Sequence, residues 1–476
     1  MARTARHYHL LGIGGTAMGS LAGLLQAAGH RVSGSDEDVY PPMSDQLQRL
    51  GIRYAEGYSA RNLAERPDVV VVGNAISRGN PELEHVLNER LPYASAAAVI
   101  KEEFLRGRTV AAVAGTHGKT STTSLLAWVL DAAGLEPSFL IGGVAENFGT
   151  SFRLTGSDVF VIEADEYDTA YFDKGPKMWH YLPWVAIVNN IEFDHADIFR
   201  DEIAYDYAFA RFINLVPGRG RLIAGWDSPK VRELAAKSPA PVDSFGFTGS
   251  PPARDPGGTP RWTATDVTYG ALTQYTVLRD GGVWGRVETP LAGAFNVRNA
   301  LAVIAASAAL GADPARVREG LRSYRSVRRR LEERGTVNGV TVLDDFAHHP
   351  TAVRETIAAA RQRYAGRRLI AVFEPRSYTA QRREFQQSYA DALSTADAIV
   401  LAGLFHPERY DRSTGMDPHE LVASCAARGV PARHTPDVGE IVAWLSAHTA
   451  PGDVVLIMSN GGFGGIHDRL LRALES

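Results

Sequence analysis

The chain has 476 residues, and at the usual domain size this length predicts about three domains, each with its own apolar core. Its 50 Lys and Arg residues nearly balance its 54 Asp and Glu residues, so no basic field indicates nucleic acid or a membrane surface as a partner. The single cysteine, Cys425, excludes an internal disulfide framework, and no apolar run is long enough for a signal peptide or a membrane span. These features predict a cytoplasmic protein.

The first predicted unit is the βαβ stretch "HYHLLGIGGTAMGSLAGLLQAAGHRVSGSD", whose second strand ends at Asp36. Another buried strand is expected at 67–77, and the unit is expected to close near Gly107. Gly12 and Gly14, with Ala17, match a variant of the dinucleotide fingerprint, and Asp36 is suitably spaced for a ribose hydroxyl. Gly15 lies in the same turn and is a further candidate for substrate binding. Two interpretations remain open: a nicotinamide or flavin oxidoreductase, or a substrate linked to a nucleotide diphosphate.

A phosphate loop follows the strand expected at 109–115. The segment "GTHGKTS" at 115–121 has two residues between its glycines, whereas the standard loop has four. Backbone N–H groups at the start of the helix predicted from Lys119 would bind phosphate oxygens. Lys119 would reach the β- and γ-phosphates, and the Thr120 hydroxyl would ligate Mg²⁺.

Polar side chains stand at the ends of the next two predicted strands, at 158–165 and 184–191. Glu163 closes the first, and His195 follows the second. Because the carboxyl ends of parallel strands collect ligands, these residues and Thr120 are predicted to form a Mg²⁺ shell. The Pro- and Gly-rich residues 248–262 predict an exposed loop.

Further candidates lie near the predicted boundary with the last domain. Asn296 and Asn299 stand near the start of an apolar helix and would suit an adenine edge, or they are ordinary helix-entry residues. The basic cluster "VRRRLEE" at 327–333 would meet phosphates or form a solvated segment between domains.

The last predicted unit has strands within 341–350, 367–375, 396–404 and 452–462. The first of these, "LDDFAHHPTA", ends in two carboxylates and two histidines, a cluster typical of a functional strand end. The strand–helix alternation predicts three α/β domains with largely parallel sheets. They are a Rossmann-like domain at 1–107, a central domain resembling P-loop ATPases at 108–326 and a Rossmann-like domain at 327–476.

Taken together, these motifs resemble the Mur ligase family, the ATP-dependent amide-forming enzymes of bacterial cell-wall synthesis, over nearly the whole chain. The short "GTHGKTS" loop is the version of the phosphate loop found in that family. The resemblance implies that the γ-phosphate of ATP moves to a carboxylate, and that an amine then attacks the acyl phosphate. It implies that the catalytic residues are Lys119, Glu163, His195 and Arg330.

The resemblance also implies the binding sites. The first domain would hold the UDP part of the substrate, and the third would carry the amine. Thr120, Glu163 and His195 would serve Mg²⁺. The expected ATP contacts are Gly115, Thr116, His117, Gly118, Lys119, Thr120 and Ser121 in the loop, Asn296 at adenine, Arg330 at the γ-phosphate and Asp345 at the ribose.

Two kinds of Mur ligase fit best: one joins UDP-N-acetylmuramate to L-alanine, the other joins it to L-alanyl-γ-D-glutamyl-meso-diaminopimelate during murein recycling. "EADEYDTAYFDKGPKMWHYLP", "FEPRS" and "MSNGGFGGIH" favour the tripeptide. His348, His349 and Arg376 are the candidate residues for the amine site. A non-catalytic binder of nucleotide sugars is the remaining alternative.

The chain also departs from patterns of the family. Phe295 replaces the histidine that commonly precedes the adenine-binding asparagine. No lysine lies between Met178 and Pro229, so the carbamoylated lysine that some relatives place beside their metals has no candidate. The "DNPR" stretch that recognises diaminopimelate in a related ligase is missing as well, and the tripeptide contacts therefore cannot be transferred.

Overall fold

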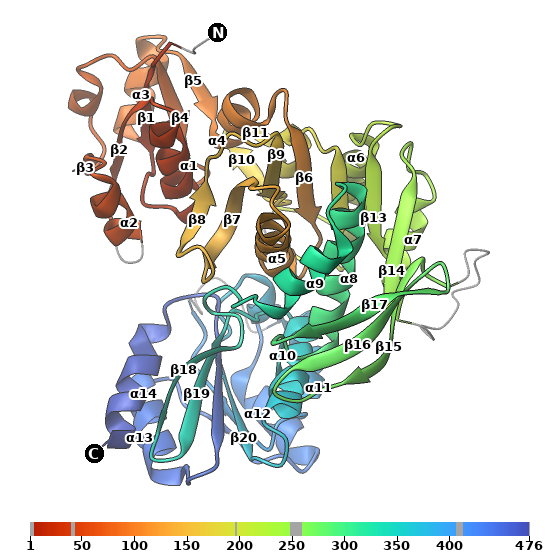
Figure 1. Cartoon of the computed structure of the whole chain (residues 1–476). Coiled ribbons are helices and arrows are strands. Elements are labelled where there is room, and N and C mark those ends of the chain that lie inside the picture. The colour runs from red at the N-terminus through yellow and green to blue at the C-terminus, as the bar shows by residue number, and fades with distance from the viewer. Residues whose placement is uncertain (1–3, 40–42, 196–197, 248–258, 406–412, 476) are drawn as a thin grey trace.

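The described residues of the computed structural model form three large sheets, each flanked by helices (Figure 1), and one two-stranded hairpin. It describes residues 4–39, 43–195, 198–247, 259–405 and 413–475. Most of the loop expected at 248–262 lies outside these residues. The prediction of three α/β units with largely parallel sheets is confirmed. The strands of each sheet come from a single predicted range, while the limits 1–107, 108–326 and 327–476 themselves stay a prediction.

The first sheet is parallel, with strand order β3-β2-β1-β4-β5. This order reverses beside β1, where a doubly wound sheet binds its ligands. The strands are β1 (His7–Leu11), β2 (Arg31–Asp36), β3 (Tyr54–Glu56), β4 (Val69–Val72) and β5 (Tyr93–Ser95). The helices are α1 (Thr16–Ala27), α2 (Met43–Leu50), α3 (Pro81–Asn88) and α4 (Ala96–Ile100).

The middle sheet has ten strands in the order β17-β16-β15-β14-β13-β12-β6-β9-β7-β8. Pairing is parallel from β15 to β7, and both edges are antiparallel. The antiparallel edge β15–β17, which sequence patterning did not reveal, arises because short turns rather than helices join these strands. The strands are β6 (Thr109–Ala114), β7 (Ser138–Ala145), β8 (Thr150–Arg153), β9 (Val159–Glu163), β12 (Val185–Val188), β13 (Arg221–Gly225), β14 (Val242–Phe247), β15 (Trp262–Thr268), β16 (Thr273–Arg279) and β17 (Gly282–Thr289).

Helices cover both faces of this sheet. On one face, α5, α8 and α9 pack in a common core. On the other, α6 and α7 share a core with the first domain. The helices are α5 (Lys119–Ala132), α6 (Glu202–Asn214), α7 (Pro229–Ala235), α8 (Ala294–Ala309) and α9 (Pro314–Arg322), and β10 (Asp168–Ala170) pairs with β11 (Asp173–Pro176) in a separate hairpin.

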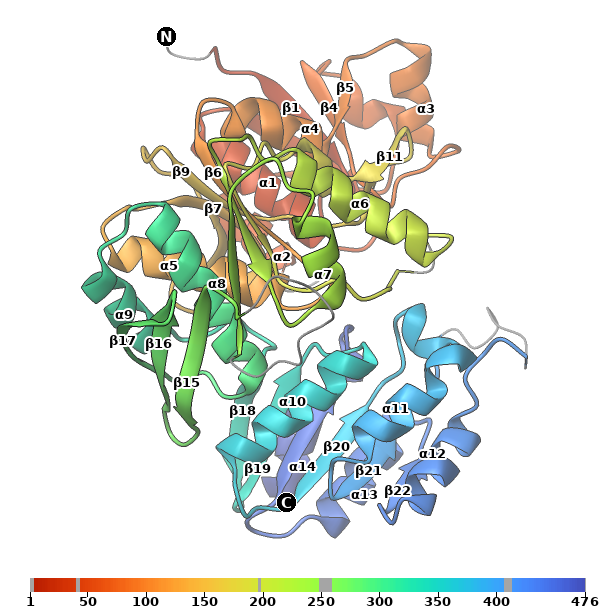
Figure 2. The same cartoon turned by 90° about the vertical axis from the view of Figure 1, so that its right-hand side faces the viewer.

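The third sheet has strand order β18-β19-β23-β20-β21-β22, with β18 antiparallel to the rest. Helices α10, α11 and α12 cover one face (Figure 2), and α13 and α14 cover the other. The strands are β18 (Glu332–Val337), β19 (Val340–Asp345), β20 (Leu369–Phe373), β21 (Ala398–Leu401), β22 (Ala432–His434) and β23 (Val454–Met458). The helices are α10 (Pro350–Arg363), α11 (Gln386–Leu393), α12 (Pro418–Ala427), α13 (Val438–His448) and α14 (Ile466–Glu475).

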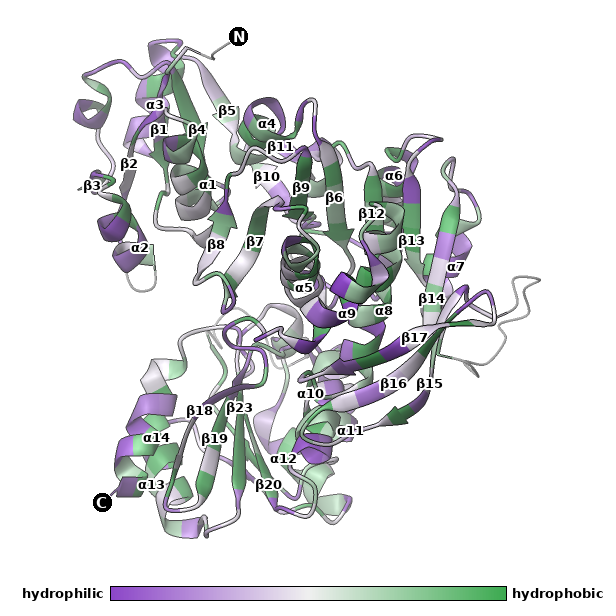
Figure 3. Cartoon of the chain, in the orientation of Figure 1, coloured by the Kyte–Doolittle hydropathy of each residue, from purple (hydrophilic) through white to green (hydrophobic). Residues whose placement is uncertain are grey.

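Apolar residues concentrate on the central strands of the sheets (Figure 3). All residues of β20 and β23 are buried, and so are Val110–Ala114 of β6. Strands covered by helices on both faces need such continuous apolar runs. The polar residues that follow these runs therefore lie at the carboxyl edges of the sheets, next to neighbouring domains.

Candidate active site

The phosphate loop joins β6 to α5, and its two glycines are required by its geometry. Gly115 has a φ of 137°, and a Cβ there would lie 3.1 Å from the backbone nitrogen of Asn189. Gly118, with a φ of 80°, precedes α5, and its Cβ would lie 2.9 Å from Asn299 Oδ1. Both conformations favour glycine. The first N–H groups of α5 lie at this turn and have no carbonyl partner within the helix, so the loop can bind an anion.

Lys119 lies under the loop with only 12% of its side chain exposed. Its ammonium donates to the carbonyl oxygen of Gly115 and to Glu166, at 2.8 Å in each case. Burial disfavours the charged form, but the carboxylates of Glu166, Asp165 and Glu163 together outweigh it and raise the pKa of Lys119. The loop therefore carries a fixed positive charge in a site with little access to water.

Thr120 and Glu163 are brought together as predicted for a metal shell. The Thr120 hydroxyl donates to one carboxylate oxygen of Glu163 at 3.0 Å, and the Gly142 N–H donates to the other at 2.7 Å. Burial raises the pKa of Glu163. A hydroxyl and a carboxylate are hard oxygen donors, so this pair fits Mg²⁺ by its chemistry.

His195 lines the same cavity as Thr120 and Glu163, and its role at a metal stays a prediction. Its Nε2 lies 3.1 Å from Glu166, the carboxylate that also holds Lys119. Its backbone is left-handed, with a φ of 56°, and its N–H donates to the Asp194 side chain at 2.7 Å. Burial disfavours its proton, but Glu166 and Asp194 raise the pKa of His195 above its usual range.

Sequence reasoning missed Glu166 and gave Asp194 no role of its own. Glu166 is fully buried, three residues beyond the strand end at Glu163. The only signal for it was a third carboxylate within "EADE", a spacing that is also common on exposed loops. Asp194 is buried and accepts a hydrogen bond of 2.6 Å from Thr379 of the third domain. That contact joins residues 185 positions apart, which local patterning cannot reveal.

The basic cluster at 327–333 divides into three separate roles. Arg330 donates to the Thr120 hydroxyl at 3.3 Å and so faces the loop. Arg329 donates to the carbonyl oxygens of Ser459 and Gly461, at 2.7 and 2.8 Å, which anchors it within the third domain. Arg328 forms an ion pair with Glu146. Of the three, Arg330 is the one that donates a hydrogen bond to Thr120, beside the phosphate loop.

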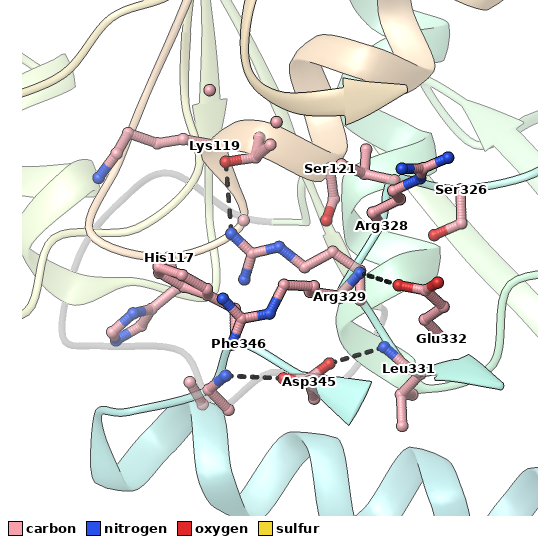
Figure 4. A pocket seen from close by; sticks show the side chains of 18 of the residues that line it. His117, Lys119, Ser121, Ser326, Arg328, Arg329, Leu331, Glu332, Asp345 and Phe346 are labelled. Carbon is pink, nitrogen blue, oxygen red and sulfur yellow. Dashed lines mark hydrogen bonds between the residues drawn. The ribbon is translucent and has the colours of Figure 1, made fainter. Parts of the chain in front are cut away.

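Asp345 ends β19 and binds backbone N–H groups on both sides (Figure 4). Its carboxylate accepts from Leu331 and Ala347, at 2.8 Å each. Burial raises the pKa of Asp345. Asn296, buried near the start of α8, donates to the Ala292 carbonyl at 2.7 Å and accepts from Asn299 at 3.3 Å. Both predicted ATP residues are thus held in fixed positions.

A cavity of about 880 Å³ lies where the three domains meet. The first domain contributes Thr16, Met43 and Asp45, and the third contributes Arg330 and further residues. The candidate residues that line it are Thr116, His117, Gly118, Lys119, Thr120, Ser121, Glu163, His195, Asn296, Arg330, Asp345 and His348.

The N-terminal glycine turn lies after β1. Gly12 has a φ of 80°, and Gly15 directly precedes α1. The Asp36 carboxylate accepts the Gly14 N–H at 2.8 Å and the Tyr58 hydroxyl at 3.1 Å, so it holds the turn in place. A ribose contact for Asp36 stays a prediction.

The three candidates for the amine site have different surroundings. His348 lines the cavity, and burial lowers its pKa to about 4. His349 caps α10, accepting the Thr351 N–H at 3.4 Å. The Arg376 guanidinium lies 3.7 Å from the centre of the Phe405 ring. Neither His349 nor Arg376 is among the residues that line the cavity, and their binding roles stay predictions.

Three family models cover most of the chain. "Mur ligase family, catalytic domain" matches residues 7–107, "Mur ligase middle domain" matches 113–307, and "Mur ligase, glutamate ligase domain" matches 329–461. The chain belongs to the Mur ligase family. Mur ligases are ATP-dependent enzymes that form ADP and phosphate and in general use Mg²⁺, so the chain is a ligase rather than an oxidoreductase.

Relatives match this ligase from end to end. The UDP-N-acetylmuramate–L-alanyl-γ-D-glutamyl-meso-2,6-diaminoheptandioate ligase of Escherichia coli K12 is 43% identical over 98% of each chain. A UDP-N-acetylmuramate–L-alanine ligase of Stenotrophomonas maltophilia R551-3 is 35% identical over 98% of this chain and 95% of its own. The crystal structure of a murein peptide ligase from Psychrobacter arcticus superposes with a TM-score of 0.73, at 36% identity over 99% of each chain. No helix in the described part of the chain could cross a bilayer.

Proposed function

We propose that this Mur ligase joins the carboxylate of UDP-N-acetylmuramate to the amine of L-alanyl-γ-D-glutamyl-meso-diaminopimelate, through an acyl phosphate, in murein recycling. The observation that carries the proposal is the shared cavity, in which the phosphate loop faces Arg330 and Asp345 of the third domain. ATP, one substrate and an amine could meet there. Such an enzyme would work in the cytoplasm, where ATP is present.

The residues of the cavity suit phosphoryl transfer. A carboxylate is a poor acyl donor at neutral pH, and phosphorylation supplies its leaving group. The first turn of α5 and the Lys119 ammonium would hold the phosphates, while Arg330 would stabilise charge on the transferred group. Thr120 and Glu163 would hold Mg²⁺, which neutralises phosphate charge when bound. Asn296 and Asp345 would fix adenine and ribose.

His195 and Glu166 would support this arrangement from the side. Glu166 bridges the Lys119 ammonium and the His195 ring. If either Lys119 or His195 moves away, the other keeps Glu166 to itself. His195 would serve a metal once phosphate draws Lys119 from Glu166. Among the described residues that line the cavity, the one lysine is Lys119.

The choice of the tripeptide over L-alanine rests on similarity along the whole chain, 43% against 35% for the two relatives. Both reactions would use the same lactyl carboxylate, bound near the N-terminal glycine turn. The difference must lie where the amine arrives, beside His348, His349 and Arg376. A guanidinium suits the extra carboxylates of a tripeptide through paired hydrogen bonds.

Phosphate release decides between the two amines. With UDP-N-acetylmuramate and ATP present, the tripeptide should support turnover far faster than L-alanine, because a pocket built for carboxylates leaves donors unpaired with alanine, at about 1–3 kcal/mol per group. Equal or faster rates with L-alanine would overturn the tripeptide proposal and leave the ATP chemistry standing. Absence of ADP production with either amine would indicate a non-catalytic binder.

A further inference from the structure

A cluster of two histidines and a glutamate lies across the boundary between the middle and third domains. His117 belongs to the phosphate loop, Glu192 follows β12, and His349 begins α10 of the third domain. One ligand atom from each side chain lies within 4.8 Å of the other two. The two imidazole rings lie 4.6 Å apart between centroids and are tilted by 39°. The cluster thus joins donors from both sides of a domain boundary.

The spacing of these atoms suits a tetrahedral metal. His117 Nε2 lies 3.3 Å from Glu192 Oε2, and His349 Nδ1 lies 3.6 Å from the same oxygen. Ligands held about 2.0–2.1 Å from zinc in a tetrahedron lie about 3.4 Å from each other. The two measured separations fall close to that value, so a metal could enter with small side-chain movements.

Hydrogen bonds hold two of the three ligands in place. The Asn190 side chain accepts the His117 N–H at 2.8 Å and donates to the His117 carbonyl at 3.3 Å. The Thr116 hydroxyl likewise bonds both the N–H and the carbonyl of Glu192, at 2.9 Å each. These bonds fix the backbone of His117 and Glu192, the positions from which both side chains extend. In the third ligand, His349, the Nδ1 atom accepts a long hydrogen bond of 3.4 Å from the Thr351 N–H. A metal could replace that bond.

The donor set differs from that of the proposed magnesium site. Mg²⁺ prefers oxygen ligands, such as those of Thr120 and Glu163, whereas two imidazoles and one carboxylate are typical of zinc. The two ligand sets share no residue. Three protein ligands also leave a fourth tetrahedral position for water.

We propose that His117, Glu192 and His349 bind a divalent transition metal of the zinc class, which ties the phosphate loop to the third domain. Opening of the third domain would then require release of His349 from the metal. The site goes beyond the ligase reaction proposed above, because it needs neither ATP nor an amine. Its occupancy would hold the cavity closed.

Titration of the full-length protein with Co²⁺ alone, without nucleotide, tests the site. We expect one Co²⁺ per chain with the intense visible absorption of a tetrahedral complex. His349→Asn should weaken binding by more than about 100-fold, since it removes a ligand outright. Asparagine is itself a good N-cap, so α10 should keep its start in this variant. Glu192→Gln should weaken binding in the same direction.

Two control variants test whether Co²⁺ binds at this cluster rather than at another site. His419→Asn removes an exposed histidine of α12 and should leave Co²⁺ binding unchanged. Glu163→Gln damages the proposed magnesium site and should also leave the tetrahedral spectrum in place. A spectrum that survives His349→Asn, or that is lost in Glu163→Gln, overturns the proposal, as does the absence of a tetrahedral spectrum in the wild type.

Thermal unfolding provides a second readout. Zn²⁺ should raise the melting temperature of the wild type, because a ligand that binds only the folded state stabilises it. The rise should disappear in His349→Asn and persist in His419→Asn. An equal rise in both variants would place the metal elsewhere.

Discussion

The first and third domains contact the middle domain in different ways. Between the first and middle domains the apolar core is continuous, with Leu21 of α1 in the same buried cluster as Phe160 of β9. Gly23 leaves room for the Phe152 ring, since a Cβ there would lie 2.1 Å from the end of that ring. Beside it, the buried hydroxyls of Ser20 and Ser151 are hydrogen bonded at 2.7 Å.

The contact with the third domain is largely polar. Arg330 reaches Thr120, and Thr379 donates to Asp194. Arg298 of α8 forms an ion pair with Glu355 of α10. An apolar contact accompanies these bonds around Phe295, which packs against the core of the third domain. Water can replace most of these interactions.

The difference indicates which domain moves. Separating a continuous apolar core exposes apolar surface to water, whereas polar contacts exchange for contacts with water at smaller cost. We expect the first domain to stay on the middle domain while the third opens and closes over the cavity. The segment between them contains Ser326, Arg329 and Leu331, all with positive φ, which marks a sharply bent connection.

The largest expected effect is a loss of turnover in the cavity between the middle and third domains. Lys119→Ala removes the cation that would meet the β- and γ-phosphates, and loss of such a group costs about a hundredfold or more in turnover. Phosphate release under saturating substrates measures it. Lys174→Ala is the matched control, because Lys174 is exposed and pairs with Asp168 away from the cavity. Near-normal turnover in Lys119→Ala would mean that the loop is structural.

Among substitutions, those at the apolar contact between the first and middle domains should lower the free energy of unfolding most. Gly23→Leu forces the Phe152 ring out of its place, and overpacking of this kind costs about 1–3 kcal/mol in unfolding free energy. Urea unfolding measures the loss, and Phe152→Ala in the same chain should relieve part of it. Gly156→Ala is the control, since nothing lies within 4 Å of a Cβ there. Equal stability of Gly23→Leu and wild type would contradict the tight contact between the two domains.

A substitution with a smaller expected effect should distinguish closure of the third domain from folding of the chain. Thr379→Val removes the hydrogen bond to buried Asp194, a loss of about 1–3 kcal/mol that falls on the closed arrangement. We expect turnover to fall about tenfold while the urea midpoint changes little. Thr336→Val, which removes a hydroxyl hydrogen bonded to Thr341 on the neighbouring strand and away from the cavity, should leave turnover unchanged. A fall in stability without a fall in turnover would show that Thr379 supports the fold rather than closure.

The last expected effect is a pH dependence of the third domain. Burial lowers the pKa of His348 to about 4, while an exposed histidine titrates near 6.5. Between these values the unfolded chain binds a proton that the folded chain excludes. Stability should therefore fall as pH is lowered from about 6.5 to about 4, by up to about 1.4 kcal/mol per unit for this residue.

Urea unfolding at a series of pH values measures that slope. Burial also lowers the pKa of His349, so His348→Asn should remove part of the slope rather than all of it. His419→Asn, at an exposed position, should keep the full slope. An unchanged slope in His348→Asn would mean that His348 accepts a proton within the folded protein.

Local sequence was sufficient to predict the fold class and the phosphate loop. Apolar runs that end in glycine turns indicated the strand–helix units, and α5 begins at Lys119 as predicted. The pairing of Thr120 with Glu163 was predictable too, because both stand at the carboxyl edge of one parallel sheet. These features depend on neighbours in sequence or on the regular geometry of parallel strands.

Only the tertiary structure decided which partners the remaining side chains have. The structure pairs His195 with Glu166, and it divides the arginine cluster so that Arg330 faces the loop while Arg329 anchors its own domain. The Thr379–Asp194 bond and the cluster around His349 likewise join residues far apart in the chain. Such contacts depend on how separate domains pack. Domain packing is set by the shape and polarity of whole surfaces, which a local pattern of residues does not encode.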